Sequence, residues 1–102
     1  MSDLSDAARA DAEAAALAKL IGQPVVLDCR GPIVYIGTLE SITEAFYELK
    51  DADVHEMLDG RSSKEIYLMD ARKYGVRKNR AQVLVRRIEV VSISLLEDVT
   101  DY

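Results

Sequence analysis

Residues 33–54 read IVYIGTLESITEAFYELKDADV, and this stretch carries the strongest structural signal in the chain. The runs at 33–42 and 46–54 are rich in β-branched and aromatic side chains, which are typical of strands. The three residues between the runs are less apolar and predict a tight turn, so the strands should pair antiparallel. Gly37 lies inside the first run, where a glycine indicates a bulge or a strong bend.

Three further strands are expected, one before this hairpin and two after it. Residues 24–29 read PVVLDC and begin two residues after the helix-stopping Gly22, so the first three strands span 24–54. Residues 82–86 and 89–95 are short apolar runs separated by a sharp corner, so the last two strands span 82–95. Five short antiparallel strands in about 70 residues favour a small, strongly bent barrel, because closure removes most free edges.

Two helices are predicted outside the strands. Residues 5–21 are rich in alanine, with Ser5 as an N-cap and Gly22 as a stop signal, and we expect this helix to cover a sheet. A helix near 63–74 follows from the capping-box spacing of Ser62 and Glu65 and from the stop at Gly75. Its inner face is expected to hold Ile66, Met69 and Tyr74, or Leu68 and Ala71 if the helix is rotated.

The chain length of 102 residues fits one domain, with 55–81 as an inserted loop and helix and 96–102 as a tail. Its net charge of −5 hides a strong asymmetry. Residues 72–87 hold seven basic side chains and no acidic one, whereas the rest holds six basic and 18 acidic side chains. The basic window indicates a polyanion contact; the alternative is that these residues pair with the acidic surface.

Several functional classes are disfavoured by simple counts. Cys29 and His55 are the only cysteine and histidine, so neither a disulfide within the chain nor a structural zinc site is expected. Cys29 is expected to be a buried apolar residue, and the acidic residues around His55 do not follow calcium-loop spacing. No phosphate loop and no nucleophile with a base at readable spacing are present, so we expect no enzyme and no cofactor.

The absence of a long apolar run and the acidic start of the chain predict neither a membrane-spanning helix nor a secretory signal. Together with the single cysteine, these features predict a cytoplasmic protein that does not contact membranes.

Two segments resemble the signature motifs of the Sm-like proteins, the LSm and Hfq group. Residues 37–51, GTLESITEAFYELKD, resemble the first motif, and residues 85–93, VRRIEVVSI, resemble the second. The order of helix and strands agrees with the family over about residues 5–96, and 55–80 fall at its variable fourth loop. The resemblance implies a mainly β fold: a small, strongly bent five-stranded antiparallel barrel with an N-terminal helix and a short inserted helix.

The resemblance also implies a homo-oligomeric ring of six or seven subunits. In such a ring the strand near 83–86 pairs with the last strand, 90–94, of a neighbouring copy. Neither strand carries a proline or a central lysine, so both are compatible with edge pairing. The residue pattern leaves a second interpretation open, in which both strands only fill one barrel core.

The resemblance places an RNA site near the pore of the ring. Arg86 matches the basic residue of the second motif, whereas Arg87 stands where the family has glycine. Thr43 stands at the position of an aspartate, Ala45 at that of a stacking residue, and Tyr47 at that of a base-reading asparagine. The candidate RNA-binding residues are Arg86, Arg87, Tyr47, Thr43, Lys78 and Arg80.

Two functions compete at this point. The first is an RNA-binding ring of the riboregulator or chaperone type, favoured by the basic window. The second is an oligomeric scaffold with an Sm-like fold that has lost the usual RNA pocket and binds a protein partner through the inserted helix. The departures at Thr43, Ala45, Tyr47 and Arg87 favour the scaffold, and RNA affinity that falls steeply with salt would favour the ring.

Overall fold

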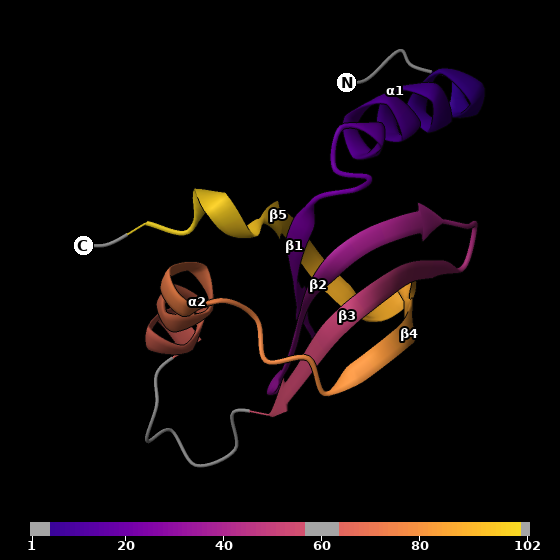
Figure 1. The fold of residues 1–102 in the computed structure, drawn as a ribbon. Helices are drawn as coiled ribbons and strands as arrows, with labels where there is room; N and C mark the ends of the chain where they lie inside the picture. The colour runs from indigo at the N-terminus through magenta and orange to yellow at the C-terminus, as the bar shows by residue number, and fades with distance from the viewer. Residues whose placement is uncertain (1–4, 57–63, 101–102) are drawn as a thin grey trace.

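The computed structural model describes residues 5–56 and 64–100, which form two helices and one sheet (Figure 1). The elements are α1 (Asp6–Ala18), β1 (Pro24–Cys29), β2 (Ile33–Ile42), β3 (Phe46–Glu56), α2 (Lys64–Tyr74), β4 (Arg80–Arg86), the 3-10 helix η1 (Arg87–Glu89), β5 (Val90–Leu95) and the 3-10 helix η2 (Leu96–Asp98). None of the helices among these residues is long and apolar enough to span a membrane.

The five strands form one antiparallel sheet in the order β4-β3-β2-β1-β5, which confirms the predicted fold class. Val85 of β4 shares a buried cluster with Val25 and Leu27 of β1, although two strands separate β4 from β1 in the sheet. The sheet must therefore curl strongly to bring these side chains together. Each end strand, β4 and β5, pairs within the chain on one side only.

Gly37 lies where the β2–β3 register shifts, as its position in the sequence predicted. A Cβ atom at this residue would lie 2.9 Å from Cβ of Ala52 and 3.2 Å from the carbonyl oxygen of Lys50. Real Cβ atoms do not approach other atoms that closely, so the missing side chain lets β2 and β3 come together at the bend.

The sheet carries apolar side chains on both faces. The concave face holds the larger cluster, which includes Leu39, Leu49 and Cys29. On the other face, Val26, Val34 and Ile36 pack against α2 and η2. Because β1 is buried on both faces, its sequence reads as a continuous apolar run rather than an alternating one.

Cys29 is buried, as predicted. Burial, reinforced by the negative charge of Asp28, raises the pKa of its thiol, so the sulfur stays protonated at neutral pH.

Helix α2 begins and ends close to the predicted positions, but the first choice of its inner face was wrong. Ala71 is buried, and Leu68 and Tyr67 pack beside it against the sheet. Ile66 and Tyr74 point outward, and Tyr74 is 82% exposed. The helix is thus rotated toward the Leu68 and Ala71 alternative. The predicted cap at Ser62 lies outside the described residues.

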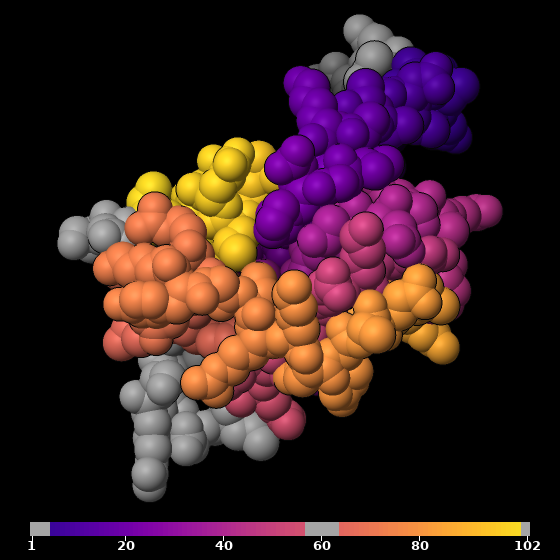
Figure 2. All heavy atoms as spheres, in the orientation of Figure 1, coloured from indigo at the N-terminus to yellow at the C-terminus, as the bar shows by residue number. Residues whose placement is uncertain are grey.

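Helix α1 does not cover the sheet as expected. Ser5 caps it by accepting a hydrogen bond of 3.1 Å from the amide of Ala8, as predicted, but the helix has no buried residue. It contacts the core through the half-buried Leu17 and, just beyond its end, Leu20. Figure 2 shows α1, in indigo, standing out from the rest of the molecule. The helix ends at Ala18, and the turn that follows leads to Gly22 with φ +86°.

A polar cluster links α2 to the end of β3. Asp53 is only 5% exposed and accepts hydrogen bonds from the hydroxyl of Tyr67 and, at 2.7 Å, from the amide of Asn79. Asn79 also accepts a hydrogen bond of 3.1 Å from the backbone of Val54. His55 stacks on Tyr67 with 4.1 Å between ring centroids. These contacts fix the position of α2 on the sheet.

Replacement of Tyr67 by phenylalanine tests this cluster. Burial first, and then the hydrogen bond to Asp53, raise the pKa of Tyr67 above its usual value of 10. A pKa that is higher in the folded state makes the protein lose stability as the pH rises above about 10. We expect Tyr67→Phe to lower the free energy of unfolding at pH 7 by about 1–3 kcal/mol. Between pH 10 and about 12, the variant should lose less stability than the original protein.

Urea unfolding across this pH range measures both effects. Tyr74→Phe is the matched control, because it removes a hydroxyl group from a side chain that is 82% exposed. Equal losses in the two variants would show that the Asp53 cluster does not hold α2.

Candidate nucleic-acid interface

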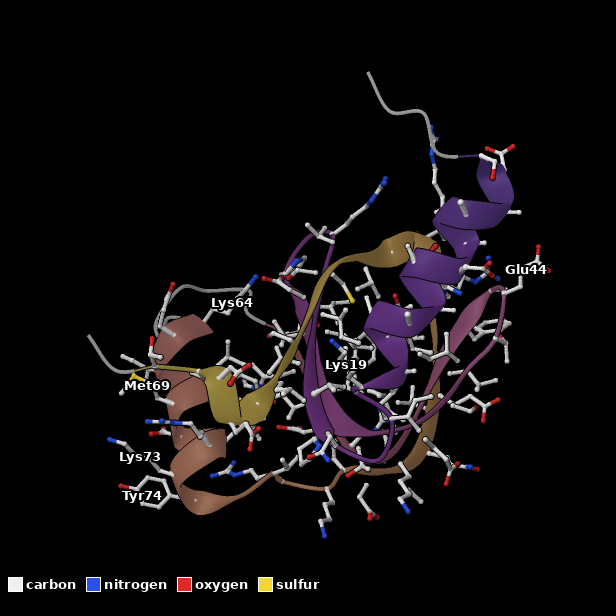
Figure 3. The ribbon with its side chains drawn as sticks, turned by 90° about the horizontal axis from the view of Figure 1, so that it is seen from above. Lys19, Glu44, Lys64, Met69, Lys73 and Tyr74 are labelled. Carbon is white, nitrogen blue, oxygen red and sulfur yellow. The ribbon has the colours of Figure 1, made fainter. Side chains whose placement is uncertain are left out.

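The basic window is divided between the two ends of β4. Arg80 begins the strand and Arg86 ends it, so their Cα atoms lie about 20 Å apart. Lys78 is exposed in the segment between α2 and β4. Figure 3 shows α2, with Lys73 and Tyr74, on the opposite side of the molecule from Glu44 in the β2–β3 turn. The structure therefore brings Arg87, Thr43 and Tyr47 into contact, with Arg86 next to Arg87 on its other side, and leaves Lys78 and Arg80 apart from them.

The β2–β3 turn is ordered by Thr43. Its hydroxyl oxygen accepts a hydrogen bond of 3.0 Å from the amide of Phe46, and its own amide donates to the carbonyl of Phe46 at 2.9 Å. The resemblance places a carboxylate at this position. In this chain the threonine hydroxyl caps the turn instead.

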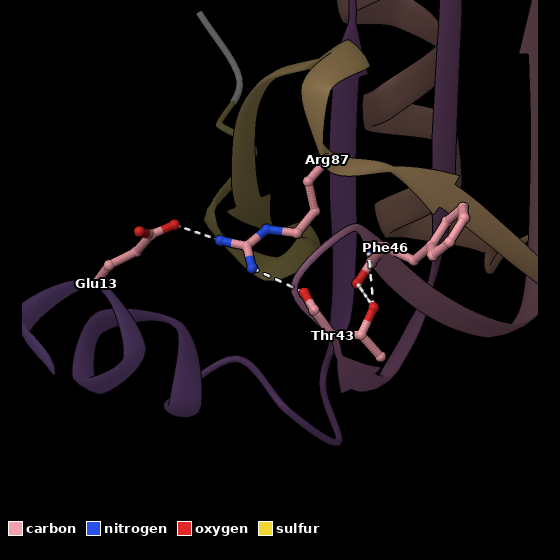
Figure 4. A network of polar contacts seen from close by, with 4 residues as sticks. All are labelled: Glu13, Thr43, Phe46 and Arg87. Carbon is pink, nitrogen blue, oxygen red and sulfur yellow. Dashed lines mark hydrogen bonds and ion pairs between the residues drawn. The ribbon is translucent and has the colours of Figure 1, made fainter. Parts of the chain in front are cut away.

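Arg87 contacts three parts of the chain, and Figure 4 shows its contacts with Thr43 and Glu13. Its Nη1 donates a hydrogen bond of 2.8 Å to the carbonyl of Thr43, and its Nη2 forms an ion pair with the carboxylate of Glu13 in α1. Its Cζ lies 5.3 Å from the ring centroid of Tyr47, and its backbone amide donates to the carbonyl of Ala45 at 2.9 Å. Arg87 therefore joins η1, the β2–β3 turn and α1.

Tyr47 belongs to the core cluster and is only 7% exposed. Arg87 lies against its ring, which favours the cation and leaves little ring surface for another group. Ala45 is exposed but offers no aromatic surface. In the isolated chain, the two positions that would stack or read a base are thus a buried ring and a methyl group.

Two hollows flank Arg87. The larger, of about 880 Å³, lies between α1 and the sheet, and Glu13, Thr43 and Tyr47 contribute to its walls. The smaller, of about 310 Å³, lies on the side of Arg86 and is lined by Glu44, Ala45, Phe46, Arg86, Arg87 and Ile88. Because Arg86 is exposed, its guanidinium group can bind a phosphate with two hydrogen bonds.

Glu13 is the residue of this network that sequence reasoning missed. It lies 74 residues from Arg87 in the chain, and no motif links the two positions. In the sequence, Glu13 is one of several acidic residues on the predicted N-terminal helix, and such residues are too common to identify it as a partner of the basic window.

At the level of sequence, no family model and no curated protein matches the chain. Solved structures do match it. The Sm protein of Pyrococcus abyssii, in complex with a uridine heptamer, is 17% identical with a TM-score of 0.56, covering 79% of this chain and 93% of that one. A heptameric archaeal Sm protein is 27% identical with a TM-score of 0.52, covering 79% of this chain and 96% of that one.

A chain of the NatC complex bound to CoA is 18% identical with a TM-score of 0.52, covering 93% of this chain and 88% of that chain. The strand order, the N-terminal helix and the similarity to the archaeal structures agree with the two sequence motifs. The chain has an Sm-like fold.

Proposed function

We propose that copies of this chain assemble into a closed ring of six or seven subunits through β4 of one copy and β5 of the next. Both strands have a free edge within the chain. Exposed apolar side chains gather on them and on η1 between them: Leu84, Ile88 and Val91. Unpaired strands with apolar side chains favour pairing with another chain. A heptamer is the state of one of the similar proteins.

This ring would bind RNA on the face that carries Arg86 and Arg87. The observation that carries the proposal is an exposed Arg86 beside a hollow, next to a turn that Thr43 and Arg87 hold in place. A ring repeats Arg86 and Arg87 in every subunit and so creates a dense positive surface. One similar Sm protein is bound to a uridine heptamer. Arg80 lies at the other end of β4 and Lys78 just before it, so these two residues would form a separate phosphate contact.

Arg86→Ala is expected to weaken RNA binding by about tenfold at low salt and to reduce its salt dependence, because every subunit loses one phosphate-binding cation. Fluorescence anisotropy with a labelled ten-nucleotide oligouridine at 50–200 mM salt measures both effects. Lys50→Ala is the matched control, since Lys50 is an exposed cation on β3 outside the basic window. Equal losses in the two variants would contradict the assignment of the site to Arg86.

A protein-binding scaffold is the second candidate function. Ile66 and Tyr74 favour it, because both are exposed apolar side chains on α2. Light-scattering mass and the ratio of absorbance at 260 and 280 nm, before and after nuclease at high salt, separate the two functions. A ring mass with a high initial ratio supports RNA, and a ring mass with a protein-like ratio supports the scaffold.

A further inference from the structure

We propose that α1 is an acidic strap over the RNA-binding face, in which Glu13 competes with an RNA phosphate for the guanidinium group of Arg87. The inference rests on the RNA binding proposed above and adds a control to the same site. A ligand would reach full affinity only after the carboxylate of Glu13 has left Arg87.

The contacts of Arg87 divide into a fixed part and an exchangeable part. Nη1 bonds to the backbone of Thr43, whose turn is ordered by its own hydrogen bonds to Phe46. Nη2 bonds to Glu13, whose side chain is 58% exposed, whereas that of Arg87 is 23% exposed. A ligand could therefore replace the Glu13 carboxylate without disturbing the Thr43 contact that orients the guanidinium group.

The anchoring of α1 makes this exchange feasible. The helix has no buried residue and is joined to the sheet by the turn that follows it. There, the amide of Gly22 donates to the carbonyl of Leu39 at 2.7 Å, and the amide of Leu39 donates to the carbonyl of Gln23 at 3.0 Å. Among the polar side chains of α1 that the structure describes, Glu13 is the one in an ion pair with another element, through Arg87 of η1. Release of Glu13 breaks this ion pair and leaves the packing of Leu17 against the core in place.

The chemistry of the exchange is matched. A carboxylate and a phosphate are both anions with two oxygen atoms that accept hydrogen bonds from the same N–H donors of a guanidinium group. A phosphate that bonds to Nη2 of Arg87 would lie next to the carboxylate of Glu13, and the two negative charges would repel each other. Binding of RNA there must therefore displace Glu13, and RNA that contacts only Arg86 need not.

Glu13→Gln in the full chain tests the competition. It keeps the shape of the side chain but removes its charge, and we expect oligouridine to bind about two- to fivefold more tightly at 50 mM salt. Asp11→Asn is the matched control, because it removes the same charge from the same helix two positions away, where the side chain faces a different direction. The affinity of the control should change by less than half as much as that of Glu13→Gln.

Hydrogen exchange of the α1 amides tests the strap without RNA. Glu13→Gln should raise the exchange rates over residues 6–18 by about two- to fivefold, and Asp11→Asn should leave them near the original values. Faster exchange together with tighter RNA binding supports the proposal. Unchanged exchange, or equal affinity gains in both variants, overturns it. If neither the original protein nor Glu13→Gln binds RNA, both the competition and the proposed RNA function are overturned. If the protein binds RNA but Glu13→Gln binds it no more tightly than Asp11→Asn does, only the competition is overturned.

Discussion

Replacing Val91 by lysine is expected to reduce the proposed ring to single chains. Val91 lies on β5, is 69% exposed and stands between Val90 and Ser92, the residues that pair with β1. A lysine on an edge strand opposes pairing with another strand, because its charge would have to be buried between two copies. The mass measured by light scattering should fall from a six- or sevenfold multiple of 11.3 kDa to that of one chain.

Tyr74→Lys is the matched control for this experiment. Tyr74 is also an exposed apolar residue, but it belongs to α2 and not to either edge strand. This variant should keep the mass of the original assembly. Circular dichroism of Val91→Lys should retain the strand signal, since Val91 contributes no core contact. A ring mass for Val91→Lys, or dissociation of both variants, would contradict pairing through β5.

Replacing Gly37 by alanine is expected to lower the free energy of unfolding by about 1–3 kcal/mol. The added Cβ would lie 2.9 Å from Cβ of Ala52 and 3.1 Å from its Cα. Because the backbone of β3 is one of the crowded groups, the strands must separate at the bend. Urea unfolding followed by circular dichroism measures the loss.

Removing the opposing methyl group should restore part of this stability. Ala52→Gly in the background of Gly37→Ala relieves the closest contact, whereas the contact with the carbonyl of Lys50 at 3.2 Å stays. We expect a favourable coupling of about 0.5–2 kcal/mol between the two substitutions. Additive losses would show that the crowding at this bend does not set the stability.

The positions of the five strands along the chain were predictable because each depends on a local pattern. The hairpin at 33–54, the bend at Gly37 and the cap at Ser5 all follow from residues that lie next to each other in the sequence. The inner face of α2 was not predictable in the same way. Apolar side chains lie on more than one side of that helix, and only its packing on Val34 and Ile36 selects Leu68 and Ala71.

The candidate site likewise has a part that follows from local sequence and a part that depends on long-range packing. The motifs bring Thr43, Tyr47 and Arg87 together, and the structure shows them in contact. The burial of Tyr47 depends on the curl of the whole sheet, and the pairing of Arg87 with Glu13 depends on where α1 stands. Both are long-range effects, so neither the exposed area of an aromatic ring nor the partner of a cation follows from local sequence.

The cover that α2 and η2 place over β1 and β2 also limits how copies can join. Because apolar groups on both faces of the sheet are packed within the chain, the proposed assembly uses the two outer strands as its attachment points. Each molecule in this assembly would bind two neighbours, so a row of copies could grow longer but could not branch. In such a system, closure satisfies both ends of the polymer at once, and the curl of each subunit sets the number of copies at which the circle closes.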